Sequence, residues 1–263
     1  MGHRAATARH QRCKFTSSQK PGFHTVITPE NSPCRYLWLF RLNLESGGSH
    51  RLEGGELELS AAVIHGTVGI CVGDVQEQLQ RFDSFYVPGG IEAAIVAREP
   101  SVLYIGGAPC EGIGAFFTRR YDPNMPFGKI RQLQGTPPFR REVFMTVDQE
   151  VAASRLISGF TWGDEGQWTS WPPHQHDDQL EEVYCYFDIP SPKFALHISY
   201  TEPGLIEQVH PVSTGDCVVI PRGYHPTVAM PGVRSSYFWV MAAQSQASRR
   251  YDLAVPDPVL TKQ

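Results

Sequence analysis

The stretch that decides the fold and the chemistry of this chain is Trp171-Pro-Pro-His174-Gln-His176-Asp-Asp-Gln-Leu-Glu181-Glu182-Val-Tyr184. His174 and His176 lie two positions apart, so on a β-strand their side chains point to the same face. Two imidazoles on one face are a normal beginning of a site for a first-row metal ion. In a chain with ten histidines one HxH also arises by chance, and both could be loop residues after the Pro-Pro turn. The pattern therefore predicts a metal site only together with further ligands.

Further candidate ligands follow along the chain. A carboxylate comes within a few residues, at Glu181 or Glu182. A third imidazole, His225, follows in the run Val219-Ile-Pro-Arg-Gly-Tyr-His225-Pro. Three neutral imidazole nitrogens and one carboxylate would hold a divalent ion and leave coordination positions open for substrate or water. Ligand type alone permits zinc, manganese, iron, cobalt or nickel.

The rest of the chain consists of short apolar runs and turn residues. Its 263 residues include 24 Gly and 21 Pro, and 41% of them are hydrophobic, which is enough to form a core. Runs of strand length, such as Tyr36–Phe40, Val102–Ile105 and Tyr237–Met241, are separated by Gly and Pro. We predict an all-β fold.

Two segments half a chain apart repeat one pattern. Asp83-Ser-Phe-Tyr-Val-Pro88-Gly-Gly90-Ile-Glu92 aligns with Asp216-Cys-Val-Val-Ile-Pro221-Arg-Gly223-Tyr-His225 at a constant offset of 133 residues. Each copy is typical of a strand that leads into a Pro-x-Gly turn. The repeat favours a duplicated β domain in which Glu92 stands opposite His225. The first half is therefore expected to hold no metal.

The chain divides by composition into four segments. We expect a disordered tail over residues 1–20, because this segment has no Asp or Glu and no apolar secretory region. An N-terminal domain is expected over residues 21–118, and a C-terminal domain with the metal site over residues 139–263. Between them, residues 119–138 are polar and rich in Pro and Gly, which predicts a linker.

The motifs carry a family resemblance. Ser170–Asp177, Glu181–Tyr184 and Val219–Pro226 resemble the bicupin family that holds 5-deoxy-glucuronate isomerase and 4-deoxy-5-ketouronate isomerase. Pro21–Asn31 and Arg35-Tyr36 are similar to the 5-deoxy-glucuronate branch. The resemblance implies two tandem cupin barrels of jelly-roll type, the first degenerate and the second with a metal ion, zinc or manganese. It also implies an aldose–ketose isomerase that converts 5-deoxy-glucuronate to 2-deoxy-5-keto-gluconate in inositol catabolism.

Carried onto this chain, the metal ligands of the family fall on His174, His176, His225 and one glutamate. Alignment of the Glu-Val-Tyr segment selects Glu182, whereas the usual cupin spacing after HxH selects Glu181. Strand parity does not separate the two, because a turn of unknown shape lies between the histidines and the glutamates. We choose Glu182.

The isomerisation moves a hydrogen between C1 and C2, either as a proton through a positioned base or as a hydride in a metal-assisted shift. Tyr184 and Tyr186 share strand parity with Glu182, so they are candidate proton donors or shuttles, or core residues. His197, within the run Phe194–Tyr200, is a candidate base or a satisfied core histidine. We take Tyr184 and His197 as candidate catalytic residues.

A uronate also needs a cation and a wall for its ring. Arg222 is the first candidate for the substrate carboxylate, since guanidinium matches carboxylate geometry and the turn brings it beside His225. Lys193 is a second candidate, and both could be solvated surface cations. Trp168 and Trp171 could stack on the sugar or pack between strands.

Composition excludes several other classes of protein. The net charge is −4, which argues against a nucleic-acid partner. No apolar run reaches the ~18 residues of a membrane span, so we expect no membrane partner. The six cysteines show no CxxC spacing and are too sparse for a disulfide scaffold, which is typical of reduced thiols in a cytoplasmic protein. The chain has no Walker-type glycine loop and no Gly-x-Ser-x-Gly elbow. The resemblance to the bicupin family implies two kinds of partner, a small sugar acid and further copies of the chain joined at sheet edges in a homo-oligomer.

Three alternatives to this function stay open. The Asp177–Leu180 connection is short, which resembles the 4-deoxy-5-ketouronate branch. Three histidines and one glutamate also suit an Fe(II) dioxygenase. A non-enzymatic cupin would bind a sugar without turnover.

Overall fold

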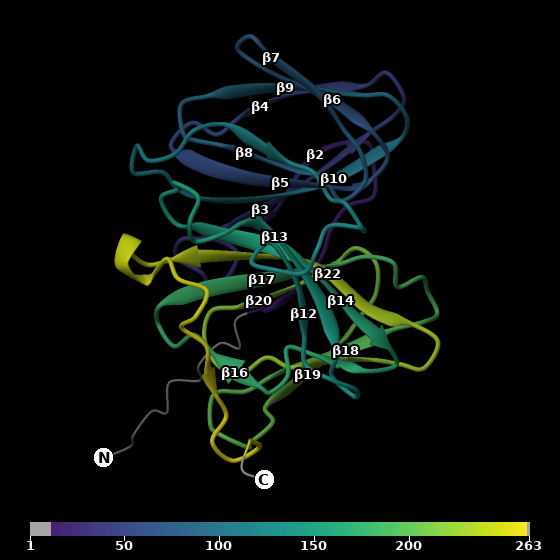
Figure 1. Cartoon of the computed structure of the whole chain (residues 1–263), viewed down its shortest axis with the longest axis vertical. Coiled ribbons are helices and arrows are strands. Elements are labelled where there is room, and N and C mark those ends of the chain that lie inside the picture. The colour runs from purple at the N-terminus through teal and green to yellow at the C-terminus, as the bar shows by residue number, and fades with distance from the viewer. Residues whose placement is uncertain (1–11, 262–263) are drawn as a thin grey trace, which may run out of the picture.

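The protein is an almost wholly β structure of two barrels stacked along its long axis (Figure 1). The structure is a computed structural model and describes residues 12–261. Within that range the chain forms no α-helix, and its only helical turn is the 3₁₀ turn η1 (Gln246–Ser248). The prediction of an all-β fold is confirmed. No helix within residues 12–261 is long and apolar enough to cross a bilayer.

The first barrel comprises a six-stranded and a four-stranded antiparallel sheet. The larger sheet contains, in spatial order, β11 (Phe117–Arg119), β8 (Ser84–Val87), β5 (Leu57–His65), β10 (Ser101–Pro109), β3 (Trp38–Leu44) and β2 (Gly22–Ile27). The smaller sheet contains β4 (Ser49–Glu53), β9 (Glu92–Ala97), β6 (Val68–Val72) and β7 (Val75–Leu79).

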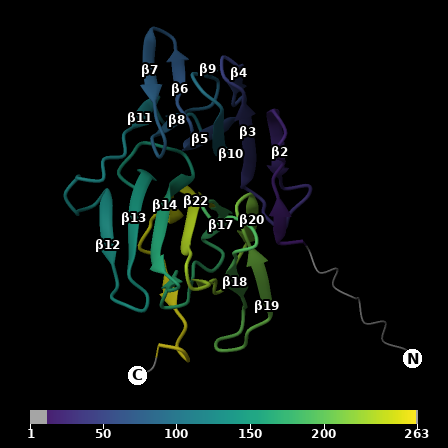
Figure 2. The same ribbon diagram turned by 90° about the vertical axis from the view of Figure 1, so that its right-hand side faces the viewer.

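The second barrel has the same plan. Its larger sheet contains β1 (Lys14–Thr16), β20 (Asp216–Ile220), β17 (Leu180–Tyr186), β22 (Arg234–Ala243), β14 (Leu156–Glu165), β13 (Arg141–Val147) and β12 (Arg131–Gln134). Figure 2 shows this order from β20 to β12 across the barrel. The smaller sheet contains β15 (Trp168–Thr169), β21 (Thr227–Ala229), β18 (Ala195–Ser199) and β19 (Gln208–Val212). A separate pair joins β16 (His174–Gln175) to β23 (Val255–Pro256).

The two barrels repeat one topology strand for strand. The order β8-β5-β10-β3-β2 of the first barrel matches β20-β17-β22-β14-β13 of the second. Leu59 on β5 pairs with Val87 on β8, and Glu182 on β17 pairs with Ile220 on β20. Val87 and Ile220 are related by the offset of 133 residues, so Leu59 occupies the place of Glu182. That the first barrel holds no metal stays a prediction, for which the apolar side chain in the ligand position supplies a physical reason.

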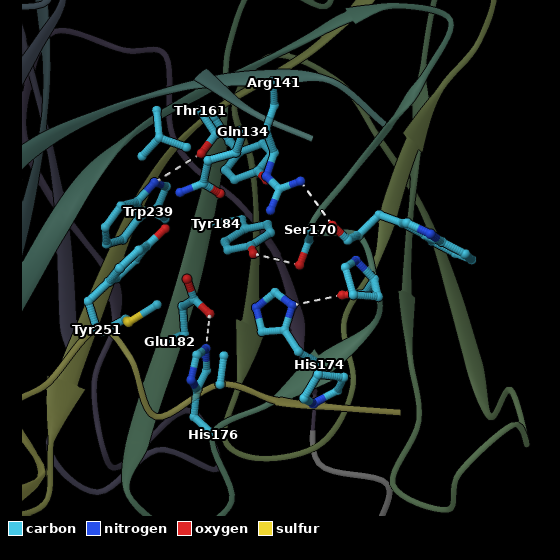
Figure 3. A pocket seen from close by; sticks show the side chains of 17 residues that line it. Gln134, Arg141, Thr161, Ser170, His174, His176, Glu182, Tyr184, Trp239 and Tyr251 are labelled. Atoms are coloured by element: carbon cyan, nitrogen blue, oxygen red, sulfur yellow. Dashed lines mark hydrogen bonds and ion pairs between the residues drawn. The ribbon is translucent and has the colours of Figure 1, made fainter. Parts of the chain in front are cut away.

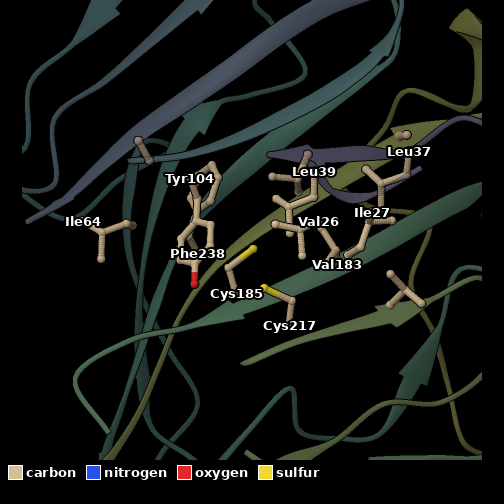
Figure 4. Packing of buried hydrophobic residues seen from close by; sticks show 14 of the residues in the cluster. Val26, Ile27, Leu37, Leu39, Ile64, Tyr104, Val183, Cys185, Cys217 and Phe238 are labelled. Atoms are coloured by element: carbon tan, nitrogen blue, oxygen red, sulfur yellow. The ribbon is translucent and has the colours of Figure 1, made fainter. Parts of the chain in front are cut away.

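The largest core cluster lies between the barrels, where the large sheets pack face to face (Figure 4). Leu39 and Tyr104 of the first barrel meet Val183 and Phe238 of the second in one cluster. The sheets approach so closely that a Cβ added at Gly106 on β10 would lie 2.5 Å from a methyl carbon of Val240 on β22. This glycine therefore belongs to the contact between barrels rather than to a turn.

The alternation of side chains along β17 divides its residues between two environments. Val183 and Cys185 belong to the core between the barrels. Leu180, Tyr184 and Tyr186 belong to a second cluster inside the second barrel. Because successive strand residues point to opposite faces, Glu181 faces the other barrel and Glu182 faces the interior of its own.

Two buried glutamates connect the barrels reciprocally. Glu58 on β5 accepts hydrogen bonds from the backbone N–H groups that lead into β14, at Ser154 (2.7 Å), Arg155 (2.5 Å) and Leu156 (2.7 Å). Glu181, at the matching place on β17, accepts from the backbone N–H groups of Arg35 (2.7 Å) and Tyr36 (2.8 Å), which lead into β3. Each carboxylate thus satisfies backbone donors of the opposite barrel, and we name the two together the glutamate clamps.

The structure differs from two expected segment boundaries. The expected disordered tail over residues 1–20 includes β1, which pairs with β20 of the second barrel because Thr16 and Lys14 both bond to Asp216. Residues 1–11 lie outside the described range. The expected linker over residues 119–138 contains β12, which extends the large sheet through β13. The polar composition of β12 reflects its position at the sheet edge. The division into domains otherwise stays a prediction.

Candidate metal centre

Three imidazoles and one carboxylate converge inside the second barrel, and Figure 3 shows two of the imidazoles, His174 and His176, together with Glu182. His174, His176 and His225 each place one ring nitrogen within 4.8 Å of the others. Glu182 Oε2 lies 3.1 Å from Nε2 of His225 and 3.6 Å from Nε2 of His176. The structure thus brings together all four residues that the sequence analysis chose as ligands. That they bind a metal ion stays a prediction.

The strands explain how residues far apart in sequence meet here. His174 lies on β16 and His176 directly after it, Glu182 points inward from β17, and His225 follows the Pro-Arg-Gly turn after β20. Since β17 and β20 are paired neighbours, the end of the β20 turn lies beside Glu182. His225 and Glu182 are almost wholly buried, which holds both side chains in place.

The ring nitrogens and the carboxylate present free lone pairs to one another. Nδ1 of His225 lies 3.0 Å from the carbonyl of Gly223, and Nδ1 of His174 lies 3.0 Å from that of Pro172. Because a carbonyl only accepts, each Nδ1 carries a proton, which leaves each Nε2 as the ring nitrogen that can bind a cation. Among the described residues, Nε2 of His225, Oε2 of Glu182 and both ring nitrogens of His176 are buried without a hydrogen-bond partner. Facing lone pairs repel unless a cation lies between them, so this donor set fits a divalent ion.

The charge states also suit a cation. Burial, reinforced by the neighbouring His225 and His176 rings, lowers the pKa of His174 to about 3. Burial alone would raise the pKa of Glu182, but the facing imidazoles outweigh it and the pKa falls to about 2. His174 is therefore neutral and Glu182 ionised near neutral pH, the forms in which both ligate metals.

A cavity of about 260 Å³ opens beside this cluster. Pockets for drug-sized ligands are typically about 300–1,000 Å³, so the cavity suits a small ligand. It is lined by Gln134, Arg141, Val143, Thr161, Ser170, Trp171, Pro172, His174, His176, Glu182, Tyr184, Tyr237, Trp239, Met241, Tyr251, Ala254 and Pro256.

Tyr184 is the predicted catalytic residue that lines the cavity. Its hydroxyl donates to Ser170 Oγ at 3.2 Å, and its ring stacks on Tyr237 with centroids 4.1 Å apart. Burial, followed by the charge of Glu182, raises its pKa well above the ordinary value. The hydroxyl therefore stays protonated and is a hydrogen-bond donor rather than a base.

His197 lies behind the cavity wall. It is fully buried, and its Nδ1 is 2.8 Å from the hydroxyl of Tyr186. Its ring lies 5.3 Å from that of Tyr184. Burial lowers its pKa well below the ordinary value, so the imidazole is neutral. This geometry allows His197 to orient the tyrosines from behind, and a role as base stays a prediction.

The two cations predicted for the substrate carboxylate do not line the cavity. Arg222 is exposed in the Pro-x-Gly turn. It lines a second pocket, separate from the cavity beside the histidines, together with Arg35 and Glu207. The turn directs His225 inward and Arg222 outward, so proximity in sequence does not bring Arg222 into the pocket. Lys193 is also exposed, and its ammonium donates to the carbonyl of Gly232 at 2.7 Å.

The two tryptophans have different surroundings. Trp171 lines the cavity, as the hypothesis of a sugar wall requires. Trp168 lies 5.0 Å from it, ring centroid to centroid, and packs on a cluster that includes Ile198 and Tyr200.

The sequence analysis missed two sources of pocket residues. One is the start of β13, which contributes Arg141 on the same face as Val143, and this parity is a signal present in the sequence. The other is the C-terminal tail, from which Tyr251, Ala254 and Pro256 line the cavity. The pairing of β23 with β16 places the tail there, and no sequence pattern indicates this contact.

Comparison with known proteins assigns the chain to a family. A model of the KduI/IolB family matches residues 10–255. The chain belongs to the KduI/IolB family. A 5-deoxy-glucuronate isomerase of Bacillus velezensis is 31% identical over 242 residues, which cover 84% of this chain and 86% of the relative. One of Geobacillus kaustophilus is 29% identical over 244 residues, covering 86% of each chain.

Solved structures show the same fold. An IolB-like protein from Salmonella typhimurium superposes with a TM-score of 0.83 at 24% identity, covering 95% of this chain and all of that chain. Bacillus subtilis oxalate decarboxylase, described with Mn(II) centres, gives a TM-score of 0.63 at 16% identity and covers 94% of this chain and 79% of that chain. The predicted bicupin fold is confirmed. Within the KduI/IolB family the chain is an enzyme of the isomerase class.

Proposed function

We propose that this chain is a metal-dependent isomerase that converts 5-deoxy-glucuronate to 2-deoxy-5-keto-gluconate. The observation that carries the proposal is the convergence of His174, His176, His225 and Glu182, with unpartnered lone pairs, beside a small cavity. Relatives that cover most of the chain are named for this isomerisation, which supports the choice of substrate.

The four converging residues would hold one divalent ion, for which we propose zinc or manganese. Imidazole and carboxylate ligands suit both metals. A bound ion would supply Lewis acidity toward the oxygens of the substrate.

The side chains of the cavity bind and orient the sugar acid. Tyr184 offers a protonated hydroxyl beside Glu182, suited to donate a hydrogen bond to a substrate oxygen. Trp171 and Trp239 give the cavity apolar walls, and aromatic faces suit the C–H faces of a sugar. Tyr251 and the tail residues beside it restrict access of water.

The wider setting follows from the same proposal. We propose a role in inositol catabolism in the cytoplasm, with a small sugar acid as partner and with homo-oligomers formed at sheet edges. The net charge of −4 supports the absence of a nucleic-acid partner.

The test begins with the protein purified without chelator. Bound metals are quantified by mass spectrometry, and 5-deoxy-glucuronate is then added under argon while the product is followed by NMR. We expect about one metal per chain and conversion to the keto acid without oxygen. Turnover that depends on oxygen would favour the dioxygenase, and conversion of 4-deoxy-5-ketouronate alone would assign the other substrate. Absence of metal after reconstitution would contradict the proposal and favour a sugar-binding cupin.

A variant provides the internal control. His225→Ala removes one imidazole without touching the core between the barrels, so the fold should persist while metal and activity are lost. Full metal content and turnover in this variant would contradict the assignment of the site.

A further inference from the structure

The cavity has two chemically different ends (Figure 3). The histidines and Glu182 form one end. At the other, the guanidinium of Arg141 reaches into the cavity above Tyr184 and Ser170. Among the described lining residues, Arg141 is the only arginine or lysine, and Glu182 is the only carboxylate.

The position of Arg141 follows from strand parity. It is the first residue of β13, and Val143 and Met145 on the same face belong to the core of the second barrel. Glu142 points to the opposite face, where it bonds to Arg131 at 2.8 Å. The nearest acidic residue in sequence is therefore turned away and already paired, so it does not neutralise Arg141.

The guanidinium is anchored on one side only. Nη1 donates to the carbonyl of Trp171 at 2.9 Å and, at 3.4 Å, to that of Phe139. Within residues 12–261 neither Nε nor Nη2 makes a hydrogen bond, and Arg141 forms no ion pair. These contacts fix the plane of the guanidinium and leave donors on the cavity side for a ligand.

A partly buried guanidinium without a carboxylate partner destabilises the protein unless an anion pairs with it. Anchoring one carbonyl requires only one N–H, so the contact with Trp171 does not by itself account for an arginine here. Guanidinium recognises carboxylates through parallel N–H donors, which is the geometry that the free side of Arg141 offers.

We propose that Arg141 binds the carboxylate of the sugar acid, and that this contact sets the direction in which the substrate lies. The carboxylate end points to β13 and the carbonyl end points to the histidine cluster. The inference rests on the proposed function, because it names how the same cavity selects an acid over a neutral sugar.

The test compares the wild-type protein and variants of Arg141 on two substrates. The substrates are 5-deoxy-glucuronate and 5-deoxy-glucose, which carries a CH₂OH group in place of the carboxylate. Arg141→Met should lower kcat/KM for the acid by about 10²–10³-fold, as expected for loss of a desolvated charge partner. The same variant should change kcat/KM for the neutral sugar by less than about threefold. Arg141→Lys should recover part of the loss for the acid.

Equal losses on both substrates would overturn the inference, because they would show that Arg141 serves only to hold the Trp171 loop. An unchanged kcat/KM for the acid would overturn it too. Metal content and melting temperature are measured for each variant. The matched control is Arg140→Met, since Arg140 is exposed, adjacent in sequence and paired with Asp164 outside the cavity. It should leave both substrates unaffected.

A binding measurement separates this inference from the proposed function. The probes are the two substrates with the aldehyde reduced to an alcohol, which cannot isomerise. By calorimetry the wild-type protein should bind the acid more tightly than the neutral alditol, and Arg141→Met should remove the difference. This result would uphold the carboxylate contact even if the wild-type protein isomerised neither sugar. Equal affinity of the wild-type protein for both probes would overturn it.

Discussion

At the scale of single residues, adjacent glutamates have separate tasks. Glu182 faces three imidazoles inside the second barrel, while Glu181 accepts two backbone hydrogen bonds from the first barrel. Their sequence context alone left the choice of ligand open. The packing of Val183 and Cys185 against the other barrel settles which of the two points inward.

The two glutamates therefore provide a matched pair of substitutions. Glu182→Gln should lower metal retention at least tenfold, because it removes the one anionic ligand from the cluster. Glu181→Gln should leave metal retention unchanged but cost about 1–3 kcal/mol of stability, since a charged acceptor of backbone donors is lost. Metal content after dialysis and thermal melting measure the two effects. Metal loss in Glu181→Gln with retention in Glu182→Gln would reverse the assignment.

Some single residues of the site could be predicted from the sequence, and others could not. The HxH pair and His225 belong to short motifs with a chemical reason for their spacing, so the structure places them where the sequence analysis expected. Arg222 does not line the cavity as expected, because the turn that directs His225 inward directs Arg222 outward. Arg141 was missed because its role depends on a cavity that other strands complete.

At the scale of elements, the C-terminal tail fixes one wall of the cavity. Asp257 is fully buried and accepts hydrogen bonds from the hydroxyl of Tyr200 and from three backbone N–H groups, those of Gly204, Val259 and Leu260. Burial alone would raise the pKa of Asp257, but these hydrogen bonds outweigh it and hold the pKa below its ordinary value. The carboxylate thus ties the residues after β23 to Tyr200 and Gly204 of the segment after β18, while β23 itself pairs with β16, the strand that carries His174.

We expect Asp257→Asn to loosen this tail without unfolding the barrels. Hydrogen exchange at residues 250–261 should accelerate by roughly 10–100-fold, the equivalent of losing about 1–3 kcal/mol of local stability. In the wild-type protein the stabilisation of the tail by the Asp257 carboxylate is complete above about pH 4, the ordinary aspartate pKa. It is lost as the pH falls through the lowered pKa of Asp257. The variant should lack this dependence. Asp252→Asn, at an exposed ion pair with Arg250, is the control and should not change exchange.

The strands themselves were easier to predict from the sequence than the strands with which they pair. Runs such as Tyr237–Met241 have the length and composition of strands, and the structure contains them within β22. β1 and β12 were missed because they are short, polar and stabilised by the sheets they join. The paired strand β23 depends on a contact that no local pattern encodes.

At the scale of the whole molecule, the glutamate clamps make the two barrels interdependent. Glu58 satisfies three backbone donors at the start of β14, and Glu181 satisfies two before β3. In each barrel, therefore, one strand of the large sheet starts on a contact supplied by the other barrel. The duplication was visible in the constant offset of 133 residues, but the reciprocal contact required the structure.

We expect Glu58→Gln to weaken both barrels together. An amide in place of the carboxylate turns a donor toward buried N–H groups, which should cost about 3 kcal/mol. The protein should still melt in one calorimetric transition, and metal release should coincide with it. Glu56→Gln is the control, because this residue is exposed two positions away. Two separate transitions in the Glu58 variant would show that the barrels unfold independently.

The pairing of β1 with β20 has a consequence for the order in which the protein is made. Thr16 bonds to Asp216, a residue 200 positions later. At a synthesis rate of about 5–20 residues per second, roughly 10–40 s pass between the emergence of these two residues from the ribosome. β1 is therefore among the last strands of its sheet to find its place, and the nascent chain carries it unpaired while the first barrel folds. Closure of the second barrel on the ribosome thus waits for β1 to return to a strand made 200 residues later.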